Sequence, residues 1–278
     1  MSARADHTTL AGTRWRPTAT VAASIGLHCA AGAATVVEPA LWPWTVGGVA
    51  ANHAFLGALG LWPRSTWLGP NWTRLPAASA ARHEIALTFD DGPDPEITPR
   101  VLDLLDASGA RGTFFCIALH ARAQAALCRE IVRRGHAVEN HSYGHRSLSF
   151  PMLGLRGFRR EVSQAQAAIA DVTGRAPRFF RAPAGLRNPL LDPVLHELGL
   201  TLASWTRRAF DTRDDDAGRV TRRLLQGLAP GDILLLHDGQ GARTAAGEHV
   251  VMAVLPQVLA AVRGTGCVPV TLRHAIER

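Results

Sequence analysis

Two adjacent acids, Asp90 and Asp91, follow an apolar run and stand before a Gly-Pro turn. Burying an isolated carboxylate is costly, so neither acid is expected to lie unpaired in a core. A pair of carboxylates at this point could carry out proton transfer or bind a metal. The alternative is an ordinary acidic turn before the next helix, a description that suits the neighbouring Asp94 and Glu96 better.

Two histidines, His141 and His145, stand four residues apart. One helical turn between them would place both imidazoles on the same side. Surface helices also carry such pairs, so the spacing alone leaves that alternative open. Together with a carboxylate from another strand end, two imidazoles would complete the three-ligand set of a catalytic zinc site and leave a fourth position for water.

Two further residues stand at the ends of apolar runs. His237 follows the run 233–236, and it is either a rim residue or a proton donor for a departing amine, because the histidine pKa lies near neutrality. Arg181 is either a surface ion-pair partner or a group that holds a nearby carboxylate.

The elements that must position these residues alternate between two periodicities. Short β-type runs are expected at 84–89, 112–117, 137–140, 179–181, 200–204, 232–236 and 268–270. Segments of helical period lie between them at 99–107, 122–134, 155–173, 191–198, 217–228 and 250–263. This alternation predicts a parallel sheet covered by helices, either an open doubly wound sheet or a closed barrel. Polar residues just after the strand ends favour the barrel, because there the strand ends converge on one face.

The N-terminal part has a different composition. Between Arg16 and Arg64 the only charged residue is Glu38. Stretches at about 17–37 and 41–62 are long enough to cross a bilayer core of roughly 30 Å, which predicts a transmembrane hairpin. A cleaved signal peptide or an apolar subdomain is the alternative. Six tryptophans stand at or near the edges of these stretches, as interfacial anchors would: Trp15, Trp42, Trp44, Trp62, Trp67 and Trp72.

Charge predicts the orientation of this hairpin. Arginines precede it and follow it, at Arg4, Arg14 and Arg16 and at Arg64, Arg74 and Arg82. The positive-inside rule then places both ends, and the following domain, on the cytoplasmic side of a bacterial-type inner membrane, with the exterior side as the alternative.

Length and composition set the wider limits. The chain has 278 residues with 47% apolar content, which suits one catalytic domain at 83–278 after an N-terminal segment at 1–82. The formal charge of +7 is spread along the sequence without a basic block, so nucleic acid is not an expected partner, whereas an anionic membrane surface or a phosphate-bearing substrate is. The four cysteines have no metal-type spacing and predict no disulfide framework. The oligomeric state stays open.

These residues, in this order, resemble the polysaccharide deacetylase family, also called the NodB homology domain, over about residues 85–271. The first, second and fifth motifs match Thr88-Phe89-Asp90-Asp91-Gly92, His141-Ser142-Tyr143-Gly144-His145 and Leu235-Leu236-His237. The third matches less completely as Arg181-Ala182-Pro183-Ala184-Gly185, and the fourth mainly through Trp205 and Asp211.

The resemblance implies a distorted (β/α)7 TIM-like barrel and a metal-dependent hydrolase that removes an N-acyl group from an amino sugar. Asp91, His141 and His145 would bind a divalent metal, usually zinc, with Asp90 as general base and His237 as general acid. Arg181 would orient Asp90, and Asp211 would support the acid–base pair. The backbone N–H of Ala184 would stabilise the oxyanion, and Tyr143 and Leu235 are candidate substrate contacts from the matched motifs.

Departures from the family pattern bear on the substrate. Ala182, Ala184 and Thr212 stand where proline or aromatic residues are frequent. A groove with fewer aromatic walls favours a small or lipid-carried amino sugar over a long polymer. Two alternatives are a deformylase of a lipid-phosphate-linked sugar and an inactive membrane-bound carbohydrate-binding protein, although the intact base, ligand and acid positions argue against the latter. An aspartate-nucleophile phosphatase is disfavoured because its two acids are normally separated by one residue.

Overall fold

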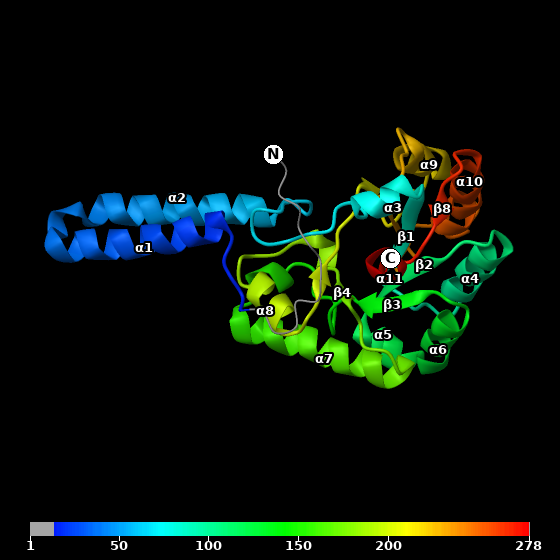
Figure 1. The fold of residues 1–278 in the computed structure, drawn as a ribbon, viewed down its shortest axis with the longest axis horizontal. Helices are drawn as coiled ribbons and strands as arrows, with labels where there is room; N and C mark the ends of the chain where they lie inside the picture. The colour runs from blue at the N-terminus through cyan, green and yellow to red at the C-terminus, as the bar shows by residue number, and fades with distance from the viewer. Residues whose placement is uncertain (1–13, 278) are drawn as a thin grey trace.

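The computed structural model describes residues 14–277, and it consists of one curled parallel sheet with covering helices and a helical hairpin that projects from it (Figure 1). The sheet order is β5-β4-β3-β2-β1-β7-β6, and β8 pairs with β1. The strands are β1 (Glu84–Asp90), β2 (Gly112–Cys116), β3 (Ala137–Asn140), β4 (Phe179–Phe180), β5 (Thr201–Leu202), β6 (Arg207–Arg208), β7 (Ile233–His237) and β8 (Val268–Pro269).

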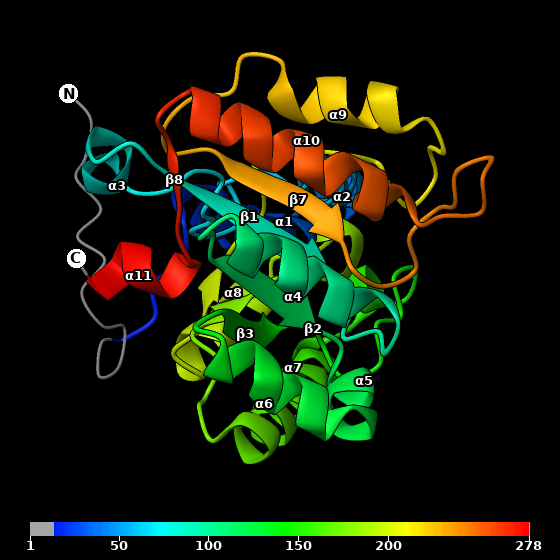
Figure 2. The same cartoon turned by 90° about the vertical axis from the view of Figure 1, so that its right-hand side faces the viewer.

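Helices cover the outer face of this sheet, as Figure 2 shows for α4, α6, α7, α9 and α10. They are α4 (Ile97–Ala107), α5 (Ala118–Ala123), α6 (Ala125–Arg133), α7 (Leu155–Thr173), α8 (Leu191–Glu197), α9 (Ala217–Leu225) and α10 (Val250–Gly264). Short helices α3 (Ala77–Ala81) and α11 (Leu272–Glu277) precede the first strand and end the chain. Three 3₁₀ turns, η1 (Pro39–Leu41), η2 (Phe150–Met152) and η3 (Pro183–Gly185), complete the set.

Alternation along the two central strands decides what faces the barrel interior. Ile85, Leu87 and Phe89 of β1 pack in the core cluster under the outer helices, whereas Ala86 belongs to the cluster inside the barrel. Because strand side chains alternate between faces, Thr88 and Asp90 share the inner face with Ala86. By the same alternation, Ile233, Leu235 and His237 of β7 face the barrel interior. A buried strand thus delivers polar residues to the inside of the barrel.

The predicted distorted barrel is confirmed, but hydrogen bonds between neighbouring strands do not continue all the way around it. Among the residues that the structure describes, no ladder pair joins β5 to β6. The linker before β1 lies at this gap, because Trp72 pairs with Ala203 and Arg74 pairs with Asp232. Trp72 and Leu75 also belong to the inner core cluster. The segment before β1 therefore helps to complete the barrel wall.

Several element boundaries differ from the sequence prediction. The helix expected at 122–134 is two helices, α5 and α6, which meet at Gln124 with φ −116° and ψ 46°. The strand expected at 200–204 is only two residues long, and β6 was not predicted because the pair Arg207-Arg208 lacks the apolar pattern of a strand. Helices α3 and α11 were also missed, since each is only five or six residues long.

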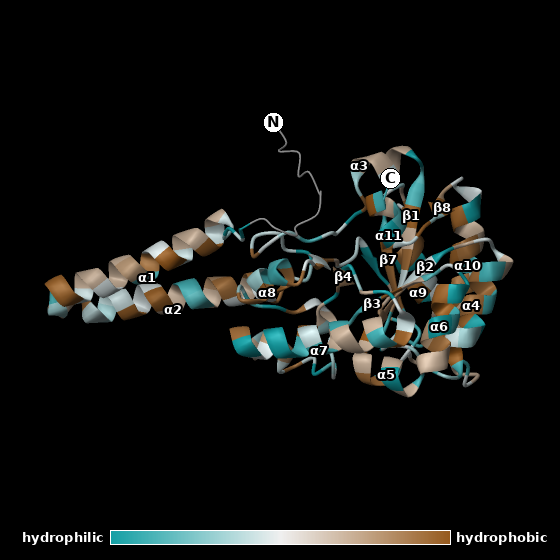
Figure 3. Ribbon diagram, turned by 60° about the horizontal axis from the view of Figure 1, so that its bottom comes forward, coloured by the Kyte–Doolittle hydropathy of each residue, from teal (hydrophilic) through white to brown (hydrophobic). Residues whose placement is uncertain are grey.

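The N-terminal hairpin consists of α1 (Ala19–Val37) and α2 (Trp42–Gly60), which lie side by side and antiparallel (Figure 1). Within residues 14–277, α1 is the one helix long and apolar enough to be a candidate membrane span. The second predicted span, α2, contains Asn52 and His53, shows hydrophilic turns in Figure 3 and is less apolar than α1, so its crossing of a membrane stays a prediction. The two predicted stretches do form two helices.

Candidate active site

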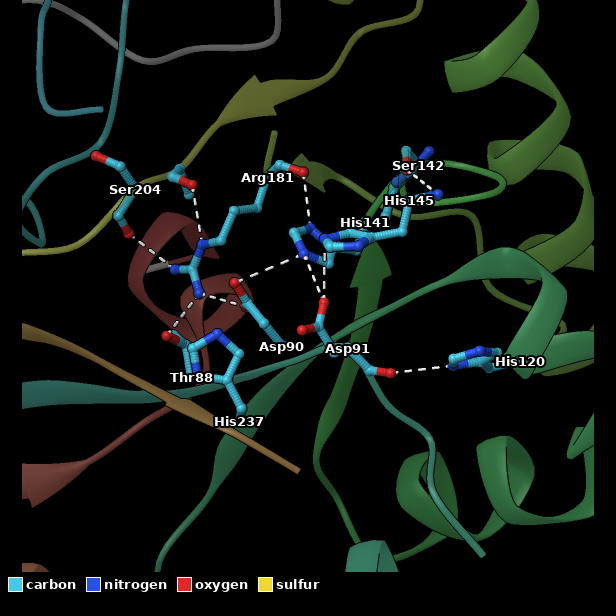
Figure 4. A network of polar contacts seen from close by, with 12 residues as sticks. Thr88, Asp90, Asp91, His120, His141, Ser142, His145, Arg181, Ser204 and His237 are labelled. Atoms are coloured by element: carbon cyan, nitrogen blue, oxygen red, sulfur yellow. Dashed lines mark hydrogen bonds and ion pairs between the residues drawn. The ribbon is translucent and has the colours of Figure 1, made fainter. Parts of the chain in front are cut away.

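The polar ends of β1, β3 and β7 meet in one hollow of about 370 Å³. Asp90 and His237 are partners in the parallel register of β1 and β7, so the two strands place them next to each other. His141 follows the end of β3, and Figure 4 shows how these side chains converge. The hollow is lined by Asp90, Asp91, His141, His145, Ser147, Leu148, Ala184, Gly185, Leu186, Trp205, Arg208, Thr212, Arg213, Leu235, His237 and Gln240.

Asp91, His141 and His145 form a group that can hold a metal ion, with one ligand atom from each residue and all three within 4.8 Å of one another. Asp91 Oδ1 lies 3.3 Å from Nε2 of His141 and 3.1 Å from Nε2 of His145. This oxygen is buried and has no hydrogen-bond partner. Nδ1 of His141 lies 2.9 Å from the backbone oxygen of Arg181, a contact that requires the proton on Nδ1 and leaves a lone pair on Nε2. In the neutral form of His141, this lone pair faces the carboxylate oxygen of Asp91, which has no hydrogen-bond partner. A cation between them would be bound by both atoms, so these residues fit a divalent metal.

The electrostatics of this group agree with that fit. Burial raises the pKa of Asp91, but the contacts with His141 and His145 outweigh it and lower the pKa to about 2. Burial, together with repulsion from His141, lowers the pKa of His145 to about 4. Metal ligands must be an ionised carboxylate and a neutral imidazole at neutral pH, and Asp91 and His145 meet these conditions. Burial lowers the pKa of His141, but the Asp90 and Asp91 carboxylates outweigh it and raise the pKa, so a bound cation would replace the proton between His141 and these acids.

The loop that carries the two histidines is not the helical turn that their spacing suggested. Residues 141–145 have no helical assignment, and Ser142 and His145 have positive φ angles of 66° and 50°. Side chains hold the loop instead: Ser142 N donates to Asn140 Oδ1, His145 N donates to Ser142 Oγ, and the N–H groups of Tyr143 and Gly144 approach Glu161 Oε2 at 3.3 Å. The imidazoles converge because the loop is folded back on itself, with ring centroids 4.6 Å apart.

Arg181 contacts Asp90 directly, as predicted for an orienting residue. Its fully buried guanidinium donates to Asp90 Oδ1 at 2.7 Å and to Thr88 Oγ1 at 2.8 Å. It also donates to the backbone oxygens of Ala203 and Ser204, and its Cζ lies 4.0 Å from the centre of the Phe115 ring. Asp90 is thus held in one orientation by a cation that is itself fixed by three other hydrogen-bond acceptors.

His237 is held by Asp211. Asp211 Oδ1 lies 2.8 Å from His237 Nδ1, and Oδ2 accepts a hydrogen bond from the His237 backbone N–H at 2.8 Å. Burial lowers the pKa of His237, but the Asp211 carboxylate outweighs it and raises the pKa to about 9. The imidazole is therefore protonated at neutral pH and can donate a proton.

The remaining predicted residues divide into two groups. Ala184, with φ 54°, and Leu235 both line the hollow. Tyr143 is not among the lining residues; its ring packs against the outer core cluster and its hydroxyl accepts a hydrogen bond from Arg122. The roles assigned to all of these residues remain predictions.

Sequence reasoning gave no role to Thr88 and Asp238, which lie behind the site. Thr88 donates to the Leu234 backbone oxygen while it accepts from Arg181. Asp238 is buried and its Oδ2 accepts from Thr98 at 2.6 Å, directly behind Gly92, where a Cβ would lie 2.3 Å from that oxygen. Thr88 belongs to the first motif and Asp238 follows the fifth, but nothing in the sequence indicates which atoms they contact.

Comparison with known proteins identifies relatives of this chain in sequence and in fold. The family model for polysaccharide deacetylase matches residues 77–203. A chitooligosaccharide deacetylase of Azorhizobium caulinodans is 34% identical over 195 residues, which cover 66% of this chain and 89% of the relative. A peptidoglycan-N-acetylglucosamine deacetylase of Bacillus cereus is 28% identical over 201 residues, covering 70% of this chain and 72% of the relative. The solved structure of the Bc1960 peptidoglycan N-acetylglucosamine deacetylase superposes with a TM-score of 0.66 at 25% identity and covers 74% of this chain and 92% of that one.

A curled parallel sheet with an Asp-His-His group at its strand ends is the architecture of a metal-dependent carbohydrate N-deacetylase, a hydrolase of non-peptide carbon–nitrogen bonds. The chain belongs to the polysaccharide deacetylase family, as the resemblance of its motifs indicated.

Proposed function

We propose that this chain removes the N-acetyl group from a small or lipid-carried amino sugar at a membrane surface. The observation that carries the proposal is the pairing of Asp90, fixed by Arg181, with His237, fixed by Asp211, in the hollow that also contains the Asp-His-His group. The names of the relatives make N-acetylglucosamine the first amino sugar to test.

Each residue then has a defined task. A divalent metal, most simply zinc, held by Asp91, His141 and His145 would supply Lewis-acid polarisation of the amide carbonyl. Asp90 accepts a proton from the attacking water, and Arg181 keeps its second oxygen engaged. The N–H of Ala184 stabilises negative charge on the carbonyl oxygen. His237 protonates the departing sugar nitrogen, and Asp211 stabilises its charged form.

Two observations support a small or membrane-held substrate over a long polymer. A volume of about 370 Å³ lies in the range of roughly 300–1,000 Å³ that is typical of small-ligand pockets. Pro63, three residues after α2 ends, packs closely on Gly185 in the wall of the hollow, because a Cβ on Gly185 would lie 2.5 Å from Pro63 Cβ. The base of the hairpin therefore touches the site.

The contacts between α1 and α2 support a membrane position for both helices. Asn52 Nδ2 donates to Ser24 Oγ at 2.8 Å, Thr35 and Thr45 hydroxyls lie 2.8 Å apart, and the His28 and His53 rings are 5.0 Å apart. Polar side chains that reduce the hydropathy of α2 thus face partners on α1, an arrangement that a bilayer tolerates. In this proposal the hairpin crosses the membrane twice and the barrel faces the cytoplasm.

The test is acetate and formate release from N-acylated amino sugars, free and lipid-linked, with and without chelator. We expect release that zinc restores after chelation and that Asp90→Asn and His141→Ala abolish. Asp171→Asn is the matched control, because Asp171 is exposed on α7 outside the hollow. Formate in place of acetate would select the deformylase alternative. Absence of release from any sugar by folded, metal-loaded protein would contradict the proposal and favour a carbohydrate-binding protein.

A further inference from the structure

Two arginines line the same hollow as Asp90 and His237 without a role in the chemistry described so far. Arg208 lies on β6, where it is the register partner of Leu235 on β7, two residues before His237. Arg213 lies in the turn after Asp211 and is exposed. It also lines an outer depression together with Phe210, so it stands where the hollow opens to the surface.

Arg208 is held in place by aromatic rings and not by an acid. Its Cζ lies 5.2 Å from the centre of the Trp205 ring and 4.8 Å from that of Phe210. Its Nε is buried and has no hydrogen-bond partner. Contact with two rings restricts the guanidinium before any ligand binds, so ligand binding should cost little additional side-chain entropy.

Neither arginine forms an ion pair with a carboxylate of the described residues. Among residues 14–277, no carboxylate oxygen lies within 4.0 Å of a side-chain nitrogen of Arg208 or Arg213. The nearby Arg219 and Arg223 differ, since both pair with Asp214, at 2.8 and 2.6 Å.

The carboxylates in and behind the hollow already have partners of their own. Asp90 pairs with Arg181, Asp91 faces the two imidazoles, and Asp211 holds His237. Asp90, Asp91 and Asp211 attract Arg208 from a distance, but none of them forms a direct ion pair with Arg208 or Arg213, so both guanidinium groups are free to pair with an anion.

We propose that Arg208 and Arg213 form a subsite for a phosphate group attached to the amino sugar. This inference rests on the proposed deacetylase function and names the class of its substrate: an N-acetylated sugar phosphate. Phosphate oxygens accept several hydrogen bonds in the planar geometry that guanidinium offers. The phosphate is either that of a soluble sugar 1-phosphate or one that joins the sugar to a lipid. Both forms fit this subsite, because Arg213 lies where the hollow opens to the surface.

The binding test uses the full-length chain freed of metal by chelation, because a bound metal would attract phosphate by itself. Calorimetry compares N-acetylglucosamine 1-phosphate with N-acetylglucosamine. We expect wild type to prefer the phosphate, and Arg208→Gln and Arg213→Gln each to weaken phosphate binding by roughly 10-fold or more. Arg213 is exposed, so its variant is expected to fold even if Arg208→Gln does not. Arg175→Gln, an exposed charge-matched control outside the hollow, should bind like wild type. Equal affinity of wild type for the two sugars would overturn the subsite. Phosphate binding that is unchanged in Arg213→Gln, and in Arg208→Gln where that variant folds, would also overturn it.

An activity test separates this inference from the function on which it rests. With metal-loaded enzyme, kcat/KM for the phosphorylated sugar should exceed that for the neutral sugar, and the ratio should fall in both arginine variants. Deacetylation of both sugars at equal kcat/KM would overturn the subsite and leave the deacetylase function standing. Arginine-dependent phosphate binding with no deacetylation would overturn the function and support the subsite. A higher kcat/KM for a polyprenyl-phosphate sugar in detergent than for the sugar 1-phosphate supports a lipid-linked source, and equal values support the soluble one.

Discussion

At the scale of single residues, the site depends on charges that are held by buried partners. Arg181 is the clearest case, because its guanidinium contacts Asp90, Thr88 and two backbone oxygens at once. A lysine ammonium cannot form this planar fork of hydrogen bonds. The orientation of Asp90 is therefore expected to depend on arginine specifically.

We predict that Arg181→Lys lowers both stability and kcat. Breaking a buried ion pair typically costs about 3–5 kcal/mol, and partial retention of the charge by lysine should place the loss at or below the lower end of that range. Urea unfolding and acetate release measure the two effects. Arg159→Lys is the control, since Arg159 pairs with Glu197 on the surface and should change stability by less than about 1 kcal/mol. Equal small losses in both variants would show that Arg181 does not hold Asp90 in this way.

The pH dependence belongs to the same scale. His237 must be protonated to donate, and its pKa is raised to about 9 because the Asp211 carboxylate outweighs the effect of burial. We predict that kcat/KM falls as pH rises through about 9, and that Asp211→Asn moves this fall toward the ordinary histidine value of about 6.5. A pH profile of both enzymes measures the shift. An alkaline limb in the same place in Asp211→Asn would contradict the assignment.

Stability should follow the same group. Folding raises the pKa of His237 above its unfolded value, so the protonated pair contributes stability in full below a pH of about 6.5. That contribution is lost as pH rises through about 9. Urea unfolding of wild type and Asp211→Asn at pH 6 and pH 10 would show it as a difference that shrinks at the higher pH.

At the scale of elements, the register of β1 and β7 and the packing of η3 determine which groups meet. Asp90 and His237 are neighbours because the two parallel strands are paired at those positions. Gly185 in η3 has φ 76°, and a Cβ there would lie 2.5 Å from Pro63 Cβ and 2.7 Å from the Trp205 ring. The linker thus packs on the wall of the hollow only because this residue has no side chain.

We predict that Gly185→Ala destabilises the protein by more than Gly174→Ala does. Both positions have positive φ, which costs a non-glycine residue about 1–2 kcal/mol, but nothing lies within 4 Å of a Cβ at Gly174. Overpacking at Gly185 adds about 1–3 kcal/mol and should also reduce activity by moving η3. Urea unfolding and acetate release are measured for both variants. Equal losses of unfolding free energy would mean that the linker moves away from the methyl group added at Gly185 without destabilising the protein.

At the scale of the whole molecule, the hairpin is anchored to the barrel at both of its ends. Trp15 Nε1 donates to Asp192 and Thr18 Oγ1 donates to the Trp67 backbone oxygen, while Arg187 N donates to the Gly60 backbone oxygen where α2 ends. Because α1 and α2 are antiparallel, both connections leave the hairpin on the side of the barrel (Figure 1). Arg14, Arg16 and Arg64 lie at this base, whereas Arg4 is outside the described residues.

We predict opposite locations for the two sides of the hairpin. An alkaline phosphatase reporter, active only outside the cytoplasm, should be active when fused after Glu38 and inactive when fused after Arg82. The Glu38 fusion is the control for export of the reporter. Activity at both positions would indicate that α1 alone crosses and that the barrel faces the exterior.

The sequence by itself was sufficient for the motif residues and for most of the sheet. Long apolar runs such as the one before Asp90 and the one before His237 predicted the two central strands, because their residues are buried on both faces. The two imidazoles of the Asp-His-His group were recognisable as candidate metal ligands from their spacing, whereas Asp91 was chosen as the third residue from the family resemblance.

Only the tertiary structure decided how those residues are supported. The loop at 141–145 is shaped by side-chain contacts with Asn140 and Glu161, and its helix-like spacing misled the prediction. The two-residue strand β6 and the linker pairing of Trp72 and Arg74 depend on contacts between segments distant in sequence. That Arg208 has no direct carboxylate partner follows from where the acids of the whole site lie. Local patterns report burial and backbone preference, whereas which charge lacks a partner is known only when every neighbour is in place.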